Sequence, residues 1–345
     1  MQKSISKILP DGSLSVLNHD FMRKYFTKRL RVFFQDAQSL VKIAIDDQSG
    51  HFYKKTIRYV LTIFTGDQTT KKYIRANIPS LDTTWEIDAS FEASDKLYRN
   101  GFNKPPFEVY RPLAKDHALR FFLYEEHSGK TLEHFIKLRP ANLKYFFEQT
   151  ALWLTKLTNL GAVCGQQKKI SREKQEIRWF LNNFRSYLPS YEKVFEQAFN
   201  DLWKIRLSLA PYLNRRLIHG DFQPKNILIT RRPQSVCAID FGNSWQYDSA
   251  SDVGQFCAIT LSLSHHHIAS SLILRKMVDV FLNVYLNNLS HSDHSLRKKI
   301  NFFTAWWLLQ NAAFQITQIK TAQEKRHFSI FSLDLARKIM RAAKL

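Results

Sequence analysis

Three side chains of this sequence, Asp221, Asn226 and Asp240, have the types and spacing that could do chemistry. Asn226 lies five residues after Asp221 in one polar stretch, and Asp240 follows 14 residues later at the end of an apolar run. A carboxylate can accept the proton of an attacking hydroxyl, and carboxylate and amide oxygens are the hard ligands that suit Mg²⁺. Phosphoryl transfer needs little more, because the protein mainly positions the reactants and offsets phosphate charge.

The elements that must position these side chains are short strands. Apolar residues, many of them β-branched, occupy positions 217–218, 227–229 and 236–239 around the polar stretch. Such runs between turn-forming residues predict strands, so the loops at their ends would direct three oxygen donors into one cleft. An ordinary β-hairpin, in which Asp, Pro and Asn only form turns, is the alternative.

The order of these residues resembles the active-site loops of kinases. His219, Asp221 and Asn226 are spaced as in the kinase catalytic loop, and the Asp-Phe-Gly sequence that begins at Asp240 resembles the metal-binding loop. Gly220 stands where eukaryotic protein kinases usually carry Arg. In this respect the chain resembles the aminoglycoside phosphotransferase and choline kinase branch of the protein kinase-like superfamily.

This resemblance implies an ATP-dependent phosphotransferase that acts on an alcohol group. It implies that Asp221 is the catalytic base, that Asn226 and Asp240 hold Mg²⁺, and that ATP and Mg²⁺ are the cofactors. In such folds His219 supports the loop and does not react. Asp252 resembles the acid that begins the next helix and holds the catalytic loop, although a helix N-cap alone would also explain it.

The resemblance also implies an α+β class and a bilobal protein kinase-like fold, and the order of expected elements agrees with it. We expect an N-lobe over residues 1–125, β-rich and covering the nucleotide, and a mainly helical C-lobe over residues 126–345 that carries the catalytic and metal-binding loops. Strands are predicted at 30–46, 56–64, 72–78, 107–110 and 119–125, and helices at 84–100 and 143–160. A hairpin turn is expected at 65–68.

The cation that anchors the ATP phosphates is expected on the third strand. Arg75 occupies the most suitable position, Lys72 competes with it, and Asn77 marks an alternative register. Kinases pair this cation with a helical Glu, and Glu92 fits that role, with Glu86 second. Arg in place of Lys departs from the pattern, since a guanidinium is bulkier but can pair bidentately with carboxylate and phosphate.

Two further residues are expected at the nucleotide. Glu125 belongs to an acidic pair that resembles the hinge between phosphotransferase lobes, and Lys225 could either neutralise phosphate charge or face solvent. Gly50 is the candidate for a phosphate-covering loop, but no Gly-x-Gly-x-x-Gly is present. Three consecutive His at 265–267 predict no metal site, because successive helical residues point about 100° apart.

The net charge of +21 indicates an anionic partner or a generally basic surface. From residue 250 to the end, twelve Lys and Arg stand against five Asp and Glu. A surface with that excess of +7 would receive a cationic antibiotic poorly, so we expect a small hydroxyl acceptor that is anionic or related to lipids or the cell envelope. A kinase-fold binding protein or weak protein kinase recruited to a membrane, polyanion or host partner is the second hypothesis. No specific recognition of nucleic acid is predicted.

The location of the chain follows from its cysteines and its apolar stretches. The three cysteines have no metal or disulfide spacing, which indicates a reducing compartment. The start shows no signal-peptide pattern, and the uncharged stretches 253–274 and 301–319 carry enough polar residues to be buried helices. We therefore expect a cytoplasmic protein. The basic C-lobe, and its C-terminal helix in particular, could contact the inner face of a membrane, but packing of that helix is preferred.

Overall fold

The computed structural model describes residues 15–51, 54–231, 234–265, 268–291 and 294–343. The chain forms two compact units, which are described separately. Unit 1 contains residues 1–128 together with 239–243, and unit 2 contains residues 129–238 and 244–345. Unit 1 carries an antiparallel sheet and unit 2 is mainly helical, so the α+β class is confirmed.

The sheet of unit 1 has the strand order β1-β2-β3-β7-β6. Its strands are β1 (Ser39–His51), β2 (Lys54–Thr65), β3 (Gln68–Pro79), β6 (Pro112–Asp116) and β7 (Phe121–Glu125). Thr65 pairs with Gln68 across the predicted hairpin turn, and Gly66 there has a φ of 57°, which glycine adopts without strain. A small hairpin, β4 (Asn103–Lys104) with β5 (Phe107–Val109), follows the helix of this unit.

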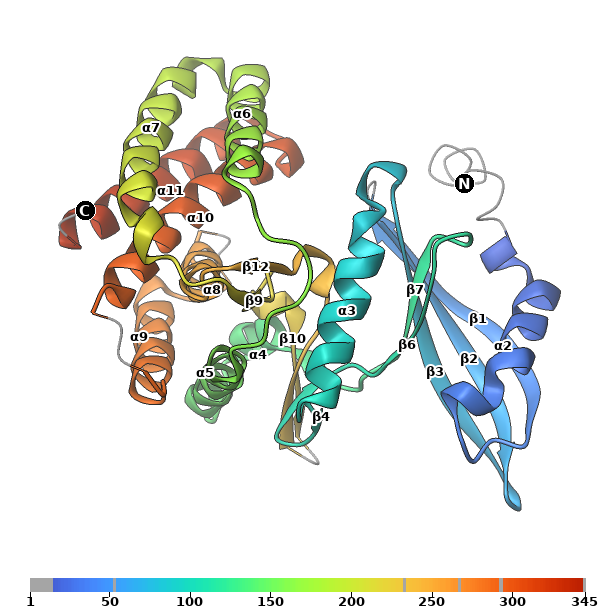
Figure 1. Cartoon of the computed structure of the whole chain (residues 1–345). Coiled ribbons are helices and arrows are strands. Elements are labelled where there is room, and N and C mark those ends of the chain that lie inside the picture. Colours follow the sequence, from blue (N-terminus) through green and yellow to red (C-terminus); the bar gives the residue numbers. More distant parts are fainter. Residues whose placement is uncertain (1–14, 52–53, 232–233, 266–267, 292–293, 344–345) are drawn as a thin grey trace. The chain divides into compact units, whose positions relative to one another are not determined.

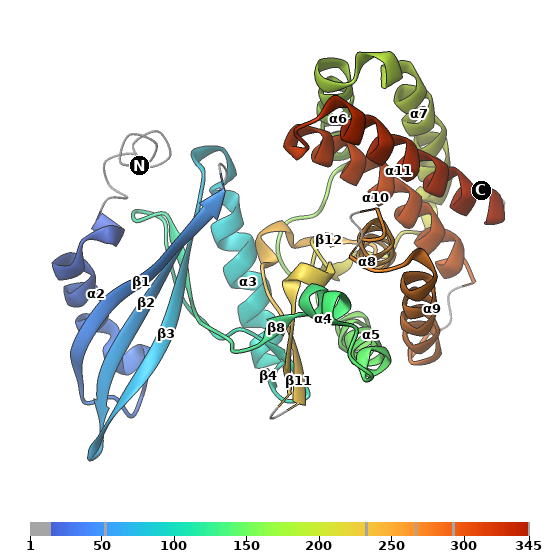
Figure 2. The ribbon, with the colours of Figure 1, turned by 180° about the vertical axis from the view of Figure 1, so that it is seen from behind.

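Helices α2 (His19–Phe33) and α3 (Trp85–Arg99) lie on opposite sides of this sheet (Figure 1; Figure 2). The expectation of a strand over residues 30–46 is wrong for its first part, because Leu30 and Phe33 belong to α2. They are buried with Met22 and Phe26 at helical spacing, and this apolar stripe packs on the sheet core. Helix α3 fits the predicted helix at 84–100.

Unit 2 contains eight helices of seven or more residues among the described residues. They are α4 (Leu132–Leu138), α5 (Leu143–Leu160), α6 (Ile170–Tyr187), α7 (Glu192–Leu209), α8 (Ala250–Ser262), α9 (Ser271–Asn287), α10 (Leu296–Gln318) and α11 (Ala322–Ala342). The stretch 253–274 is therefore two helices joined by a break. Within the described part of the chain, no helix is both long and apolar enough to span a membrane.

Helices α8 and α10 form the centre of unit 2. Gly254 makes their close approach possible, because a Cβ atom at this position would lie 2.6 Å from the Cβ of Phe303. The C-terminal helix α11 packs on α10 and buries Phe328, Leu333 and Ala336, while Leu335 stays partly exposed. The preferred expectation that this helix packs on the C-lobe agrees with these contacts.

Short strands of unit 2 hold the polar loop of interest. Strand β10 (Ile227–Arg231) pairs with β11 (Gln234–Ala238) and with β8 (Lys130–Thr131), and β9 (Arg216–Ile218) pairs with β12 (Trp245–Tyr247). The loop runs from β9 to β10 and ends in the 3₁₀ turn η5 (Pro224–Asn226). Trp153 of α5 stacks on Phe222 of this loop at a ring-centroid distance of 5.5 Å, so α5, the helix predicted at 143–160, supports the loop.

Candidate active site

The loop between β9 and β10 places Asp221 at the centre of a dense hydrogen-bond network. Its Oδ1 accepts hydrogen bonds from the side-chain amides of Gln223 and of Gln255, the latter at 3.0 Å, and its Oδ2 accepts one from Asn226 Nδ2 at 2.7 Å. Gly220, directly before it, has a φ of 75°, a conformation that side chains rarely adopt. The carboxylate is therefore fixed in orientation without any bound ligand.

Asp252, on the first turn of α8, holds the backbone of this loop. Its Oδ2 accepts a hydrogen bond from the His219 N–H at 2.7 Å and its Oδ1 accepts one from the Gly220 N–H at 2.9 Å. The N-cap of α8 is Ser249, so the expected role in holding the loop is confirmed and the N-cap explanation is not needed. Burial raises the pKa of Asp252 to about 7, against the lowering effect of these two backbone donors.

His219 is completely buried and also serves the loop. Its Nδ1 accepts a hydrogen bond from the Asp221 N–H at 3.2 Å, and its ring contacts Phe222 edge-on. Its carbonyl oxygen accepts a hydrogen bond from Ser244 Oγ at 3.2 Å, at the start of the segment that leads into β12. These contacts agree with the structural role expected for His219.

Asn226 has the geometry of a metal ligand. It donates its two amide hydrogens to Asp221, to the carbonyl oxygen at 2.9 Å and to Oδ2 at 2.7 Å, so its Oδ1 remains for a cation. A neutral oxygen fixed in this way fits Mg²⁺. Lys225 lies between the buried residues Pro224 and Asn226 but is itself exposed. It forms no hydrogen bond or ion pair with the side chain of any described residue.

In unit 1, Asp240 begins the Asp-Phe-Gly sequence with a φ of 69°. This left-handed conformation is uncommon outside glycine, and such residues concentrate at functional sites. The next two residues pack inside unit 1. The Phe241 ring meets Tyr110 edge-on at 5.7 Å, and a Cβ atom at Gly242 would lie 3.0 Å from the Glu86 Oε2. The carboxylate of Glu86 therefore lies directly against this sequence.

Arg75 on β3 pairs with the carboxylate of Glu126, the residue that follows β7. Its Nη2 lies 2.7 Å from Glu126 Oε1, and its Nε donates to the same oxygen at 2.8 Å. Arg58 occupies the other side of Glu126, with its Nε 2.6 Å from Oε2. Asn77 is nearly buried and its Oδ1 accepts from Thr56 Oγ1 at 3.1 Å, so it belongs to the interior of the sheet.

Glu92, the predicted partner of Arg75, faces the other way. It lies 3.4 Å from Lys115 Nζ of β6, which also contacts Asp88 at 2.6 Å. Asp88 and Glu92 are four residues apart and share one helix face, whereas Glu86 is six residues from Glu92, about 240° around the helix. That rotation explains why Glu86, the second candidate, contacts the Asp-Phe-Gly sequence instead.

Glu125, at the end of β7, forms two partly exposed contacts with cations other than Arg75. Its Oε1 lies 3.4 Å from Lys72 Nζ and its Oε2 lies 3.5 Å from Arg111 Nη1. Lys72 is therefore engaged with Glu125, and Arg75 with Glu126. Glu125 and Glu126, the acidic pair that resembles a hinge, thus each form an ion pair with one of the two candidates for the phosphate-anchoring cation.

Three residues of this network were missed from the sequence: Gln223, Gln255 and Glu126 as the partner of Arg75. Gln255 is almost fully buried and, besides contacting Asp221, accepts a hydrogen bond from the Phe222 N–H at 2.9 Å. It lies three residues after Asp252, hence on the same face of α8. That spacing could have predicted the contact between Gln255 and the loop, because the face of α8 that carries Asp252 also carries residue 255.

Three features define the class of kinase-like phosphotransferases. They are a β-rich part followed by a helical part, a loop in which Asp221 is held by hydrogen bonds, and an Asp-Phe-Gly sequence. Residues 44–267 match the model of the phosphotransferase enzyme family, known as APH. The chain belongs to this family. No match is found among curated proteins.

Solved structures share the fold at low sequence identity. The choline kinase of Cryptosporidium parvum Iowa II is 13% identical, with a TM-score of 0.61, covering 95% of this chain and 98% of that one. The ethanolamine kinase of Plasmodium vivax is 15% identical, with a TM-score of 0.57, covering 87% and 84%. An amicoumacin kinase in complex with AMP-PNP, Ca²⁺ and its ligand is 12% identical, with a TM-score of 0.56, covering 98% and 96%. These likenesses support the fold, while the substrates of the relatives differ from one another.

Proposed function

We propose that this chain is an ATP-dependent phosphotransferase that phosphorylates a hydroxyl group of a small anionic molecule. The observation that carries the proposal is the fixed carboxylate of Asp221, oriented by three side-chain amides on a loop that Asp252 holds. A base held in this way loses little free energy to reorganisation when the acceptor binds. Membership of the phosphotransferase family and the kinase structures of similar fold point to the same reaction.

The hydrogen bonds of Asp221 indicate which oxygen accepts the proton. Oδ1 already accepts from Gln223 and Gln255, which fills both of its lone-pair positions, whereas Oδ2 accepts from Asn226 alone among the described residues. We therefore assign Oδ2 as the atom that orients the acceptor hydroxyl and holds its proton. The amide donors of Gln223 and Gln255 keep Oδ1 in place during this transfer.

Asn226, through its Oδ1, and Asp240 are the residues that would hold Mg²⁺. When bound, the ion neutralises charge on the nucleotide phosphates. Arg75 would contribute positive charge to the nucleotide while Glu126 fixes its guanidinium. Glu125 and Lys225 remain proposed nucleotide contacts. Of the two α3 acids considered as partner of the anchoring cation, Glu86 lies against the Asp-Phe-Gly sequence, and Glu92 contacts Lys115.

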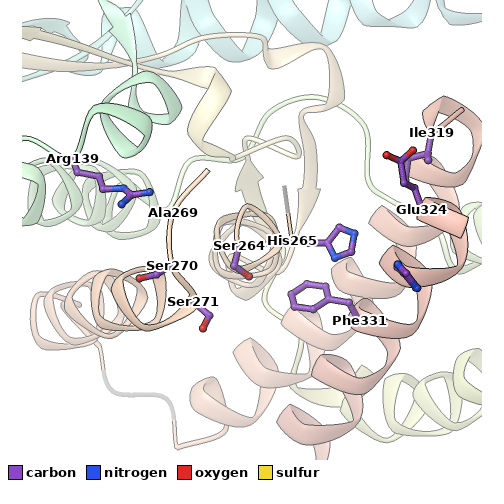
Figure 3. Close-up of a pocket in the computed structure, with 10 residues that line it drawn as sticks. Arg139, Ser264, His265, Ala269, Ser270, Ser271, Ile319, Glu324 and Phe331 are labelled. Carbon is purple, nitrogen blue, oxygen red and sulfur yellow. The ribbon is translucent and has the colours of Figure 1, made fainter. Parts of the chain in front are cut away.

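The acceptor is proposed to bind in a cavity of about 920 Å³ in unit 2. Figure 3 shows that this cavity lies among the end of α4, the ends of α8 and α10, the start of α9 and α11. Arg139, His265 and His327 line it with a single acid, Glu324, whose Oε2 accepts from Thr321 Oγ1 at the start of α11. The +7 excess of the region favours an anionic acceptor over a cationic one.

The distance between this cavity and Asp221 also sets a size for the acceptor. Gln255, which contacts Asp221, lies seven residues before the end of α8 at Ser262, about 10 Å at 1.5 Å per residue. The cavity begins just beyond that end, at Ser264 and His265. An acceptor with its anionic group in the cavity would therefore need roughly this span to bring a hydroxyl to Asp221.

A phosphorylation screen tests the proposal. Fractionated metabolite extracts are incubated with γ-labelled ATP, Mg²⁺ and either the wild-type chain or its Asp221→Asn variant, and labelled products are separated by charge. We expect a labelled, acidic small molecule with the wild type alone. If ATP binds but no fraction is labelled, and label appears on neither protein nor lipid, the second hypothesis of a kinase-fold binding protein replaces this one.

A further inference from the structure

A second cavity of unit 2, with a volume of about 480 Å³, has the features of an anion-binding site. It lies where the segment before α6, the end of α7 and the β9–β12 pair meet. Its charged lining residues, among the described part of the chain, are Lys168, Lys169, Arg206, Arg215 and Asp248. Four cations thus surround a space whose volume is typical of small-molecule sites, roughly 300–1,000 Å³.

Arg206 is a buried cation in the lining of this cavity. Its side chain is 4% exposed, its Nη2 lies 2.9 Å from Glu173 Oε1, and its Nε donates to the Tyr247 hydroxyl at 3.1 Å. Its Nη1, although buried, has no hydrogen-bond partner among the described residues. Leaving a charged donor buried without a partner costs free energy, which a bound oxyanion would recover.

The remaining charges of the lining reinforce this positive potential. Lys169 and Arg215 are exposed and form no ion pair with any described residue, while Lys168 pairs with Glu176 at 2.9 Å. Asp248 does not oppose an anion strongly, because its carboxylate is already engaged. Its Oδ2 lies 2.9 Å from the buried Lys299 Nζ and accepts from the Asn214 N–H, and its Oδ1 accepts from the Ala250 N–H.

We propose that this cavity binds the phosphate group of a phosphorylated small molecule, at a site separate from Asp221. Strand β9 separates this cavity from the loop that carries Asp221. At the start of β9, Arg216 pairs with Tyr247, which lines the cavity, and His219 begins the loop just after the end of β9. Three residues of strand correspond to about 10 Å. The volume of the cavity exceeds the volume of a phosphate ion. The proposed ligand is therefore a phosphomonoester, whose organic part fills the remaining space, and not free phosphate.

Calorimetric titration tests this site. The wild-type chain is titrated, without Mg²⁺ or nucleotide and at constant ionic strength, with inorganic phosphate and with phenyl phosphate. We expect saturable binding, with phenyl phosphate at least about tenfold tighter, as one or two additional contacts would give. Equal affinities would identify free phosphate as the ligand. No saturable binding of either probe would overturn the proposal. A water between Arg206 Nη1 and Glu173 Oε2, which is also buried without a hydrogen-bond partner among the described residues, would then explain both atoms.

Variants locate the binding. The double variant Lys169→Ala/Arg215→Ala removes two exposed cations and should weaken phenyl phosphate about tenfold or more. Arg178→Ala/Lys193→Ala removes the same charge from exposed positions on α6 and α7 outside the cavity and should change it little. Arg206→Lys should weaken it further, with circular dichroism to check the fold. If both double variants act alike, or if Asp240→Ala abolishes binding, the anion binds elsewhere and the proposal is wrong.

Discussion

The loop of unit 2 that carries Asp221 and the nucleotide-binding residues proposed in unit 1 are held in different ways. Around Asp221 the contacts are short, largely buried hydrogen bonds from amides and backbone, with Asp252 and Gln255 each almost fully buried. In unit 1, Arg75, Glu126, Lys72 and Glu125 form partly exposed ion pairs. Buried polar networks are costly to break, whereas exposed ion pairs contribute little and exchange readily.

Under the proposed assignment, the chemistry is preorganised on the loop, while the nucleotide is received by charges that can change partners. Variants on the loop should therefore reduce turnover strongly, and variants of the ion pairs should change nucleotide affinity modestly. The following predictions test that contrast, from the largest expected effect to the smallest.

Asp221→Asn should reduce kcat by on the order of 10²–10⁴, because it removes the base that accepts the hydroxyl proton. Binding of Mg-ATP, measured by calorimetry, should stay close to the wild-type value, since this carboxylate acts on the acceptor. Asp201→Asn on the exposed side of α7 serves as the control. Retention of wild-type turnover by Asp221→Asn would show that the active site has been wrongly assigned.

Asp240→Ala should weaken binding of Mg-ATP itself by about tenfold to a hundredfold, because it removes a charged metal ligand. A titration of the nucleotide with and without Mg²⁺ measures the effect. The loss should be confined to the titration with Mg²⁺. An equal loss in its absence would mean that Asp240 shapes the nucleotide site without holding the ion.

Gln255→Ala should lower kcat about tenfold while leaving the Michaelis constant for ATP unchanged. Gln255 does not react, but it positions Oδ1 of Asp221 and accepts the Phe222 N–H, so its removal also leaves a buried donor unpaired. We expect a loss of unfolding free energy of about 1–3 kcal/mol. Gln255→Glu, which keeps the acceptor for Phe222 but brings a carboxylate to Asp221, should restore neither kcat nor stability.

Asp252 should make stability depend on pH between its unfolded and folded pKa. Its pKa rises from 3.8 to about 7 on folding, so in this window the folded chain binds a proton that the unfolded chain releases. Its contribution is therefore fully present below pH 3.8 and is lost as the pH rises through about 7, with a slope of at most about 1.4 kcal/mol per pH unit. Denaturant unfolding of wild type and Asp252→Asn at several pH values measures this. A difference between the two chains that stays constant from pH 4 to pH 8 would contradict it.

Arg75→Ala should raise the Michaelis constant for ATP only a few fold, because the pair it breaks is partly exposed. Glu126→Gln should raise it to a similar degree if Glu126 fixes the guanidinium, and Glu92→Ala should change it little. A large effect of Lys72→Ala combined with unchanged kinetics for Arg75→Ala would move the anchoring role to Lys72. A larger effect of Glu92→Ala than of Glu86→Ala would restore the original choice of helical acid.

Much of the fold could be predicted from local patterns. The hairpin turn at 65–68, the helices at 84–100 and 143–160 and the strands around Asp221 are encoded by spacing over fewer than twenty residues, and the structure has them. The helical stripe of α2 was mistaken in part for a strand, because Leu30 and Phe33 stand beside a β-branched run that does form β1. A short apolar run fits both periods, and only packing on the sheet decides between them.

The sequence by itself determined which loop residues are proposed for the chemistry, because Asp221, Asn226 and Asp240 have characteristic types at a characteristic spacing. It also suggested the role of Asp252, on the first turn of α8, in holding the loop, and left an N-cap as the alternative. The tertiary structure decided the partners that lie far apart in the chain: Arg75 with Glu126, Gln255 with Asp221, and Arg206 with its cavity. Such pairings depend on how strands align and which helix face turns inward, and neither follows from the local order of residues.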